Sequence, residues 1–261
     1  MSRLPVASTR YLAIVPALNE VESIDRTVEE IRRCAPEFDV LVIDDGSTDG
    51  TGRAAAAVGA QVVRLPFNLG IGGAVQTGYI YAREHGYEVA VQLDGDGQHD
   101  ARYIPQLLAR LTDGAGFNMV TGSRFLAPAA ADDGGFRSSA PRRAGIGVFA
   151  RVVSLASHQR VTDPTSGFRM TDRHAIELFA RDYPHDYPEV EAILLMHAHR
   201  LRSCEIPVQM RARTTGRSAI SKIQAAYYMV KVLLAVFVGL FRARPTAADG
   251  DDPPVAAERS L

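Results

Sequence analysis

The stretch VQLDGDGQHD places two aspartates and a glutamine directly after a short apolar run. Asp94 and Asp96 are separated by a single glycine, so both carboxylates can reach one divalent cation. Oxygen ligands of this kind select magnesium or manganese, and Gln98 can add a carbonyl oxygen. His99 prefers a softer metal and is interpreted as a solvent or loop residue. The alternative is that the two Asp-Gly pairs only form a tight turn.

A second acidic stretch, DDGSTDGT, also follows an apolar run and carries Asp44 and Asp45. This stretch has a purely structural interpretation too. Ser47 or Thr48 can cap the next helix, with Asp49 in its first turn. Both interpretations can hold together.

Apolar runs alternate with helical patterns along the chain. YLAIVP predicts a strand, and Val21, Ile24, Val28 and Ile31 follow it at helical spacing. DVLVID, QVVRLP and YEVAVQL predict further strands, with helices over RAAAAVGA and GGAVQTGYIYAREHG between them. Such alternation predicts an α/β fold, with a mostly parallel, Rossmann-like sheet and helices on both faces.

The predicted sheet gathers the polar residues that follow its strands. Parallel strands end at a common edge, and ligands bind in α/β sheets at the carboxyl ends of the strands. Carboxylates crowded there repel one another unless a cation or hydrogen-bond donors compensate them. The residues expected on this acidic edge are Asn19, Glu20, Asp44, Asp45, Asp94 and Asp96.

Composition limits the classes of protein to consider. The 261 residues are 46% hydrophobic with a net charge of −1. This composition suits one large domain, or one domain with an appendage, and argues against a nucleic-acid partner. Cys34 and Cys204 lack ligand spacing, so we interpret them as packing residues in a reducing compartment. The start MSRLPVASTR has no signal-peptide core, which predicts a chain that begins in the cytoplasm.

Six motifs in order carry a family resemblance: IVPALNE, VLVIDDGSTDGT, NLGIGGAVQTGYIYA, QLDGDGQHD, TGSRF and DPTSGFRM. Together they resemble the family 2 glycosyltransferases with the GT-A fold. More narrowly, they are similar to the dolichol-phosphate mannose synthase type, which moves a sugar from a nucleotide to a polyprenyl phosphate. The resemblance covers roughly residues 10 to 240, and six ordered motifs are far more specific than one.

The resemblance implies a nucleotide-sugar site and a metal site. The residues that it assigns to the nucleotide-sugar donor are Pro16, Asn19, Glu20, Asp45, Gly70, Asp94 and Arg124. Those that it assigns to Mg²⁺ or Mn²⁺ on the donor diphosphate are Asp94, Asp96 and Gln98. A bound divalent ion would stabilise the charge that develops on the departing diphosphate. For the glycines of NLGIGGAVQTG, which is not a dinucleotide fingerprint, close packing is an equal alternative.

The acceptor decides which further residues matter. A hydroxyl acceptor needs a carboxylate base, for which Asp163, Glu189 and Glu191 are candidates, whereas a phosphate acceptor is already ionised and needs cations. The candidate cations are Arg124, Arg142, Arg213, Arg217 and Lys222. The residues expected in catalysis itself are Asp96, Arg124, Asp163 and Glu191. Arg169 has a weaker claim as a surface residue at a helix start.

One motif departs from the family pattern. RTTGRSAISK resembles the R-x-x-G-x-S-K of the polyprenyl-phosphate group, but Ala219 stands where the lysine is expected. Arg217 or Lys222 then takes its place. Arg142 and Arg143 open an apolar amphipathic stretch and are expected to meet an anionic acceptor or lipid head groups.

The expected organisation is a GT-A catalytic domain over 10–218, an apolar amphipathic helix over 219–242 and a disordered tail over 243–261. Only about ten residues of that helix are free of charge, too few to span a bilayer. It therefore suits an interfacial or partner-packing helix, although a buried terminal helix is the alternative. Relatives with short tails are expected to use a small membrane partner or homo-oligomerisation.

Three functions follow from these observations. The leading one is an inverting transferase that moves a sugar from UDP or GDP to polyprenyl phosphate at the cytoplasmic face of the membrane. The second uses the same fold on a sugar or glycan hydroxyl, with Glu191 or Asp163 as base. The third is a nucleotide-sugar binding protein without turnover, which the set of Asp94, Asp96 and Arg124 disfavours.

Overall fold

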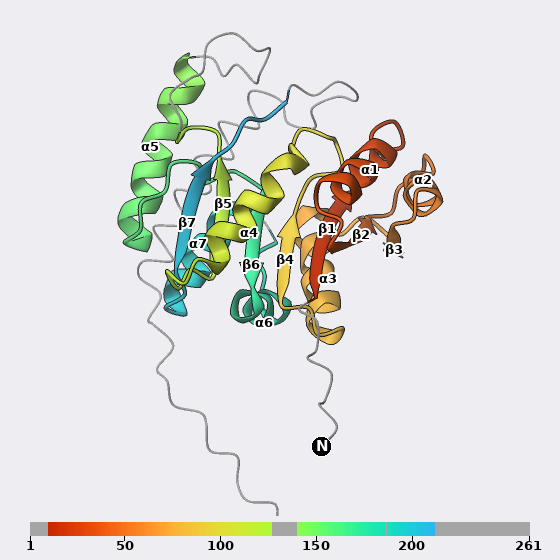
Figure 1. Ribbon diagram of the computed structural model, residues 1–261. Coiled ribbons are helices and arrows are strands. Elements are labelled where there is room, and N and C mark those ends of the chain that lie inside the picture. Colours follow the sequence, from red (N-terminus) through yellow and green to blue (C-terminus); the bar gives the residue numbers. More distant parts are fainter. Residues whose placement is uncertain (1–9, 127–139, 186, 212–261) are drawn as a thin grey trace, which may run out of the picture.

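The computed structural model describes residues 10–126, 140–185 and 187–211 (Figure 1). The strands are β1 Tyr11–Ala17, β2 Phe38–Asp44, β3 Gln61–Arg64, β4 Val89–Gln92, β5 Met119–Ser123, β6 Arg169–Asp172 and β7 Ser203–Pro207. The helices are α1 Ile24–Cys34, α2 Thr51–Ala57, α3 Gly70–Glu84, α4 Ile104–Thr112, α5 Ala140–Ser157, α6 Arg173–Arg181 and α7 Pro188–Ala198. A single 3₁₀ turn, Ala101–Tyr103, precedes α4.

The strands form one sheet in the order β3-β2-β1-β4-β6-β5-β7. All pairings are parallel except those of β6, which runs antiparallel to β4 and β5. The carboxyl ends of the other strands therefore meet at one edge of the sheet, together with the amino end of β6. This arrangement confirms the predicted mostly parallel α/β sheet.

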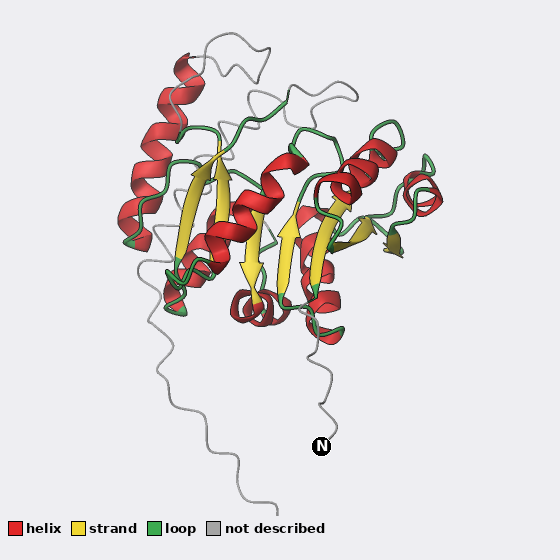
Figure 2. Cartoon of the chain, in the orientation of Figure 1, coloured by secondary structure: helices red, strands yellow, loops and turns green. Residues whose placement is uncertain are grey.

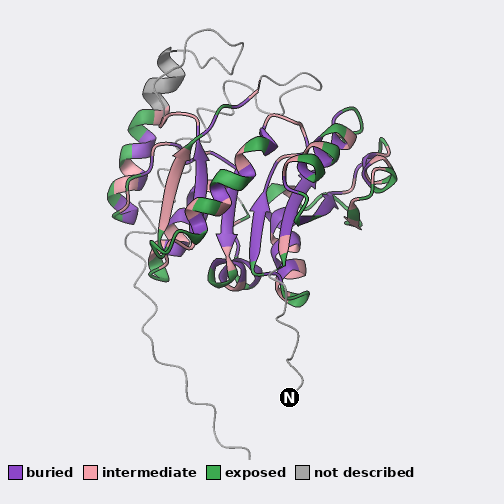
Figure 3. Cartoon of the chain, in the orientation of Figure 1, coloured by how far each residue is buried: buried purple, intermediate pink, exposed green. Residues whose placement is uncertain are grey.

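Helices cover both faces of this sheet (Figure 2), since the strands carry apolar side chains on both sides. Along β1, Leu12 and Ile14 join the core under α3, α6 and α7, while Ala13 and Val15 join the core under α1 and α4. All four side chains are fully buried, and the central strands are buried along most of their length (Figure 3). Continuous apolar runs of this kind are typical of strands covered on both faces.

Gly78 of α3 allows the close approach of this helix to β1. A Cβ at this position would lie 2.3 Å from Cγ2 of Ile14. Close packing therefore accounts for this glycine of the NLGIGGAVQTG stretch. We expect Gly78→Ala to lower the free energy of unfolding by about 1–3 kcal/mol, because neither backbone can move without disturbing the core.

Urea unfolding followed by circular dichroism measures this effect. Gly147→Ala is the matched control, since Gly147 is also helical and a Cβ there meets nothing within 4 Å. The control should be neutral or more stable by up to about 1 kcal/mol. Equal unfolding free energies for the two variants would show that Gly78 is not needed for packing.

Three local predictions from the sequence are wrong. Arg169 is the first residue of a strand and is 1% exposed, not a surface residue at a helix start. Neither Ser47 nor Thr48 caps α2, whose N-cap is Gly50 with φ +96°. Asp49 precedes this N-cap and does not lie in the first turn of the helix. The Ser47 hydroxyl instead accepts a hydrogen bond from the Asn19 amide in the loop after β1.

Part of the predicted organisation lies outside the described residues. This applies to the helix expected over 219–242, to the tail over 243–261 and to three predicted acceptor ligands, Arg213, Arg217 and Lys222. Among the residues that the structure does describe, no helix is long and apolar enough to cross a membrane.

Candidate active site

Two loops at the carboxyl edge of the sheet are held together by hydrogen bonds through Asn19. Its backbone amide donates to the Ser47 hydroxyl at 2.9 Å, and its side-chain oxygen accepts from the Thr48 amide at 2.9 Å. The Glu20 amide donates to the Thr51 hydroxyl at 2.9 Å. Asn19 adopts φ +55°, a conformation that asparagine tolerates better than most residues. The loops after β1 and β2 thus form one surface.

Asp45 fastens a third loop to this surface. Its carboxylate accepts hydrogen bonds from the amides of Leu69 at 2.7 Å and Gly70 at 3.0 Å, where α3 begins. Burial raises the pKa of Asp45, and the two backbone amides oppose that shift. The Gly70 amide also donates to the side-chain oxygen of Asn68. Both of its hydrogen-bond acceptors are therefore protein groups. The nucleotide contacts assigned to Asp45 and Gly70 therefore stay predictions.

The DGDG stretch forms a tight turn, as the structural interpretation predicts, and this turn also presents carboxylates. The metal site assigned to it stays a prediction. The Gly95 amide donates to the carbonyl of Pro16 at 3.2 Å, which ties the turn to β1. Asp96 accepts from the Gln98 amide at 3.0 Å, and Gly97 takes φ +73° between them. The Asp94 side chain remains 41% exposed, so it can meet a ligand at the sheet edge.

The donor set at this turn fits a hard divalent cation. Within the described ranges, no group of three His, Cys, Asp or Glu side chains could hold a metal ion alone. Mg²⁺ usually takes only one or two carboxylates and completes its shell with water and substrate phosphates. Asp94 and Asp96 supply that number, and the Gln98 side-chain amide makes no hydrogen bond to the described residues.

His99 is buried beneath Asp94 and is not the solvent or loop residue that the sequence predicts. Its Nδ1 accepts the backbone N–H of Asp94 at 3.0 Å, and its ring stacks on Phe168 at 5.2 Å between centroids. Burial lowers the pKa of His99 to about 4, with Arg124 acting in the same direction and Asp96 opposing it. The ring is therefore neutral at pH 7, with its proton on Nε2, which lies 3.8 Å from the Asp94 carboxylate.

We expect His99→Leu to weaken divalent-cation binding by about tenfold or more, because the Asp94 turn loses the acceptor that fixes it. The unpaired Asp94 amide should also cost about 1–3 kcal/mol of stability. Isothermal titration with Mn²⁺ and a nucleoside diphosphate measures the affinity. His199→Leu, at an exposed position after α7, is the control. Equal affinities in the two variants would exclude a positioning role for His99.

Arg124 follows β5 and is held by a buried carboxylate. Its Nε and Nη2 donate to the two oxygens of Asp163 at 2.6 and 2.7 Å, and Nη2 also donates to the Thr165 hydroxyl. The side chain of Asp163 is fully buried, while that of Arg124 is 16% exposed. Such a bidentate pair fixes the guanidinium plane. The structure therefore disfavours Asp163 as a proton-accepting base and makes it the partner that positions Arg124.

Gln92 and Arg169 form a buried polar pair beside the Asp94 turn. This pairing was not predicted from the sequence. Strand register pairs Gln92 with Arg169, and both side chains are at most 2% exposed. Arg169 donates to the carbonyls of Ser166 at 2.8 Å and Glu189 at 2.5 Å. Gln92 Oε1 and Arg169 Nη1 have no partner among the described residues. Both residues lie in quoted motifs, QLDGDGQHD and DPTSGFRM, but neither motif predicts that they meet, because their pairing depends on the antiparallel strand β6.

Glu189 and Glu191 share the first turn of α7, next to this buried group. Burial raises the pKa of Glu189, against the opposing charge of Arg169 and with the like charge of Asp94. With its raised pKa, Glu189 is a better candidate for a base than Asp163, which is held in an ion pair with Arg124. Glu191 is partly buried, and its role stays a prediction. The predicted acceptor ligand Arg142 lies in the first turn of α5, where the structure describes no side chains.

Comparison with solved structures identifies the architecture. Glucosyl-3-phosphoglycerate synthase from Mycobacterium tuberculosis, solved with Mn²⁺, UDP and glucosyl-3-phosphoglycerate, superposes with a TM-score of 0.63. The match covers 90% of this chain and 80% of that one, at 20% sequence identity. A largely parallel sheet with paired aspartates at its carboxyl edge and this likeness define the GT-A fold of glycosyltransferases.

The sequence profile of "Glycosyl transferase family 2" matches residues 12–177, so the chain belongs to this family. An undecaprenyl-phosphate mannosyltransferase from Micrococcus luteus is 40% identical over 44% of this chain and 48% of its own length. A polyprenol monophosphomannose synthase from Mycolicibacterium smegmatis is 28% identical over 85% of both chains. Thus the chain spans about half of the first of these relatives and most of the second.

Proposed function

We propose that the protein transfers a sugar from a nucleoside-diphosphate sugar to polyprenyl phosphate, with inversion at the anomeric carbon. The names of two relatives support this acceptor, since both refer to sugar transfer to a polyprenyl phosphate. The arrangement of Arg124 and Asp163 carries the proposal. A cation held rigidly beside the acidic edge suits an ionised phosphate acceptor, whereas a hydroxyl acceptor requires a base.

The reaction exchanges one bond for another at the anomeric carbon. A phosphate oxygen of the acceptor forms the new bond, and the bond from that carbon to the donor diphosphate breaks. The nucleoside diphosphate leaves with the electron pair. Asp94 and Asp96, with Gln98, would hold Mg²⁺ or Mn²⁺, which supplies Lewis-acid stabilisation of the leaving diphosphate. A manganese ion and UDP in the solved mycobacterial synthase support this assignment.

The chain's own residues orient the two substrates. The loops joined by Asn19 and Asp45 shape the surface for the nucleotide. His99 fixes the Asp94 turn, and Asp163 fixes the plane of Arg124, which then faces the substrate phosphates. Because these groups are locked before substrate arrives, they need little reorganisation during transfer. The expected location is the inner face of the cell membrane, where the segment 219–242 would lie in the interface and Arg213, Arg217 and Lys222 would meet the acceptor phosphate.

Glu189 supports a second candidate function, transfer to a sugar hydroxyl. Its raised pKa and its position beside Arg169 suit a general base better than an ordinary surface carboxylate. In that case the product is a glycoside and the proton of the hydroxyl passes to a carboxylate such as that of Glu189 or Glu191.

The chemical stability of the product separates these functions. A sugar joined to a phosphate is released by mild acid, whereas a glycoside survives the same treatment. We expect the product made with polyprenyl phosphate to release its sugar in mild acid and to show the inverted anomeric configuration by NMR. An acid-stable product, formed only with glycan acceptors, would replace the proposal with the second function.

A further inference from the structure

Helix α5 exposes aliphatic side chains on its outer face. Val148 is 55% exposed and Leu155 is 77% exposed, and they stand two turns apart on the same side. On the inner side, Phe149 and Val153 are buried in the core. The helix is therefore apolar on both sides, whereas a helix that faces only water carries polar residues on its outer side.

The same helix is strongly basic. Its 18 residues include Arg142, Arg143 and Arg151 and no acidic residue. Arg151 is exposed on the outer side, between Val148 and Leu155. Ordinary surface helices mix charges of both signs. An exposed face with Arg151 between aliphatic side chains, on a helix without acidic residues, therefore indicates an anionic, partly apolar partner.

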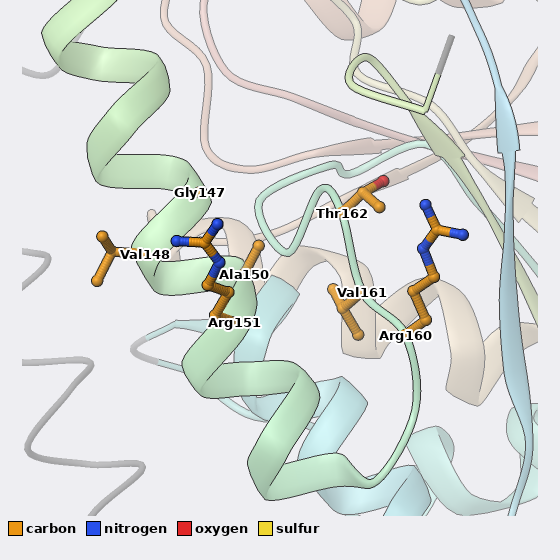
Figure 4. Close-up of a pocket in the computed structure, with 7 residues that line it drawn as sticks. All are labelled: Gly147, Val148, Ala150, Arg151, Arg160, Val161 and Thr162. Atoms are coloured by element: carbon orange, nitrogen blue, oxygen red, sulfur yellow. The ribbon is translucent and has the colours of Figure 1, made fainter.

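A cleft of about 580 Å³ opens between α5 and the segment that leads to Asp163. Arg151 lines it from the helix and Arg160 from the facing segment, with Thr162 also in its wall (Figure 4). Val148 lines the same cleft from α5 and remains 55% exposed. Among the described residues, neither guanidinium forms a hydrogen bond or an ion pair. Two uncompensated cations across a cleft suit a phosphate group.

The cleft adjoins the candidate active site. The hydroxyl of Thr162 lies 2.6 Å from that of Ser123, the residue before Arg124. Arg160 is three residues before Asp163, so their Cα atoms are at most about 11 Å apart. A lipid head group in this cleft would therefore stand close to the groups that position Arg124.

Charge argues against two other occupants of this face. The segment 219–242 carries Lys222, Lys231 and Arg242 and no acidic residue, so it would bring like charges to Arg151. A second copy related by two-fold symmetry would place the same basic face against itself. An anionic bilayer suits this face better than either of these occupants. Its phosphates can pair with the arginines, and its acyl layer can bury the aliphatic side chains.

We propose that the outer face of α5, formed by Val148, Arg151 and Leu155 together with Arg160, docks on an anionic phospholipid surface. This inference rests on the proposed function, since it gives the enzyme a way to bring its acidic edge to a lipid acceptor. The aliphatic side chains enter the boundary between head groups and acyl chains. The arginines bind head-group phosphates.

Sedimentation with vesicles tests this proposal on the full chain. The vesicles contain either phosphatidylcholine alone or 30% phosphatidylglycerol in phosphatidylcholine, roughly the charge density of a cytoplasmic leaflet. We expect Val148→Ser with Leu155→Ser to weaken binding to the anionic vesicles by about tenfold or more. Arg151→Gln with Arg160→Gln should remove the preference for anionic vesicles. Leu155→Phe, which keeps an apolar side chain, should bind like wild type.

Arg33→Gln is the matched control, because Arg33 is exposed on α1 at the other end of the sheet (Figure 1). Binding of both double variants as tight as that of wild type would overturn the proposal. So would a wild-type dimer that Leu155→Ser converts to a monomer, since a second copy would then cover the face.

Activity assays keep this proposal separate from the proposed function. With a short, water-soluble prenyl phosphate, the α5 variants should transfer sugar like wild type, and only transfer to long-chain acceptor in vesicles should fall. If wild type transfers sugar to neither acceptor, the proposed function fails, while vesicle binding still decides whether α5 is the docking face.

Discussion

Asp94→Asn is expected to lower kcat/KM for sugar transfer by about a thousandfold or more, with little change in the fold. The carboxylate side chain is 41% exposed, so an amide of the same shape can take its place without strain. The amide lacks the negative charge that, in the proposed metal site, would compensate a divalent cation on the donor diphosphate. Asp96→Asn should have a similar effect, because both carboxylates extend from one turn.

Initial rates at increasing Mn²⁺ concentration measure this loss. Glu29→Gln is the control, since it makes the same chemical change at an exposed position on α1. If the defect lies in metal binding, high Mn²⁺ restores part of the rate in Asp94→Asn and changes nothing in the control. Wild-type rates in Asp94→Asn at low Mn²⁺ would remove Asp94 from the metal site.

Arg124→Met is expected to lower the free energy of unfolding by about 3–5 kcal/mol and to abolish transfer. The stability loss arises at Asp163, whose fully buried carboxylate would lose its bidentate partner. Removing one member of a buried ion pair costs more than removing both. Denaturant unfolding and the transfer assay report the two losses separately.

The double variant Arg124→Met with Asp163→Asn separates structure from chemistry. An uncharged amide at position 163 should recover most of the lost stability, because a buried amide costs far less than a buried charge. Transfer should stay abolished, since the guanidinium that we propose to face the substrate phosphates is still absent. A double variant with wild-type activity would contradict the role of Arg124.

The central part of the fold could be predicted from the sequence because it is encoded locally. Each strand from β1 to β4 is a short apolar run followed by a turn and a helical pattern, so the parallel arrangement and its acidic edge follow from chain order. The strand β6 was missed because it has only four residues, RMTD, and pairs with strands far away in the chain.

The contacts that shape the candidate site are mostly long-range, which explains the other errors. Arg124 and Asp163 are 39 residues apart, and Arg169 reaches a carbonyl 20 residues away. Asp163, one of three candidate bases for a hydroxyl acceptor, is the buried partner of Arg124. His99, which was predicted as a solvent or loop residue, stacks on Phe168. The spacing of residues within one motif does not reveal such partners, because they lie in distant segments that come together only in the folded chain.

Transfer of labelled sugar into the lipid phase tests the central claim most directly. The purified chain is incubated with Mg²⁺, a panel of radiolabelled UDP- and GDP-sugars and polyprenyl phosphate in vesicles, and the mixture is extracted with organic solvent. We predict label in the lipid phase with one donor, matched by release of its nucleoside diphosphate and abolished by EDTA and by Asp96→Asn. Label that stays in the aqueous phase with every donor, while soluble glycans are glycosylated, would contradict the account.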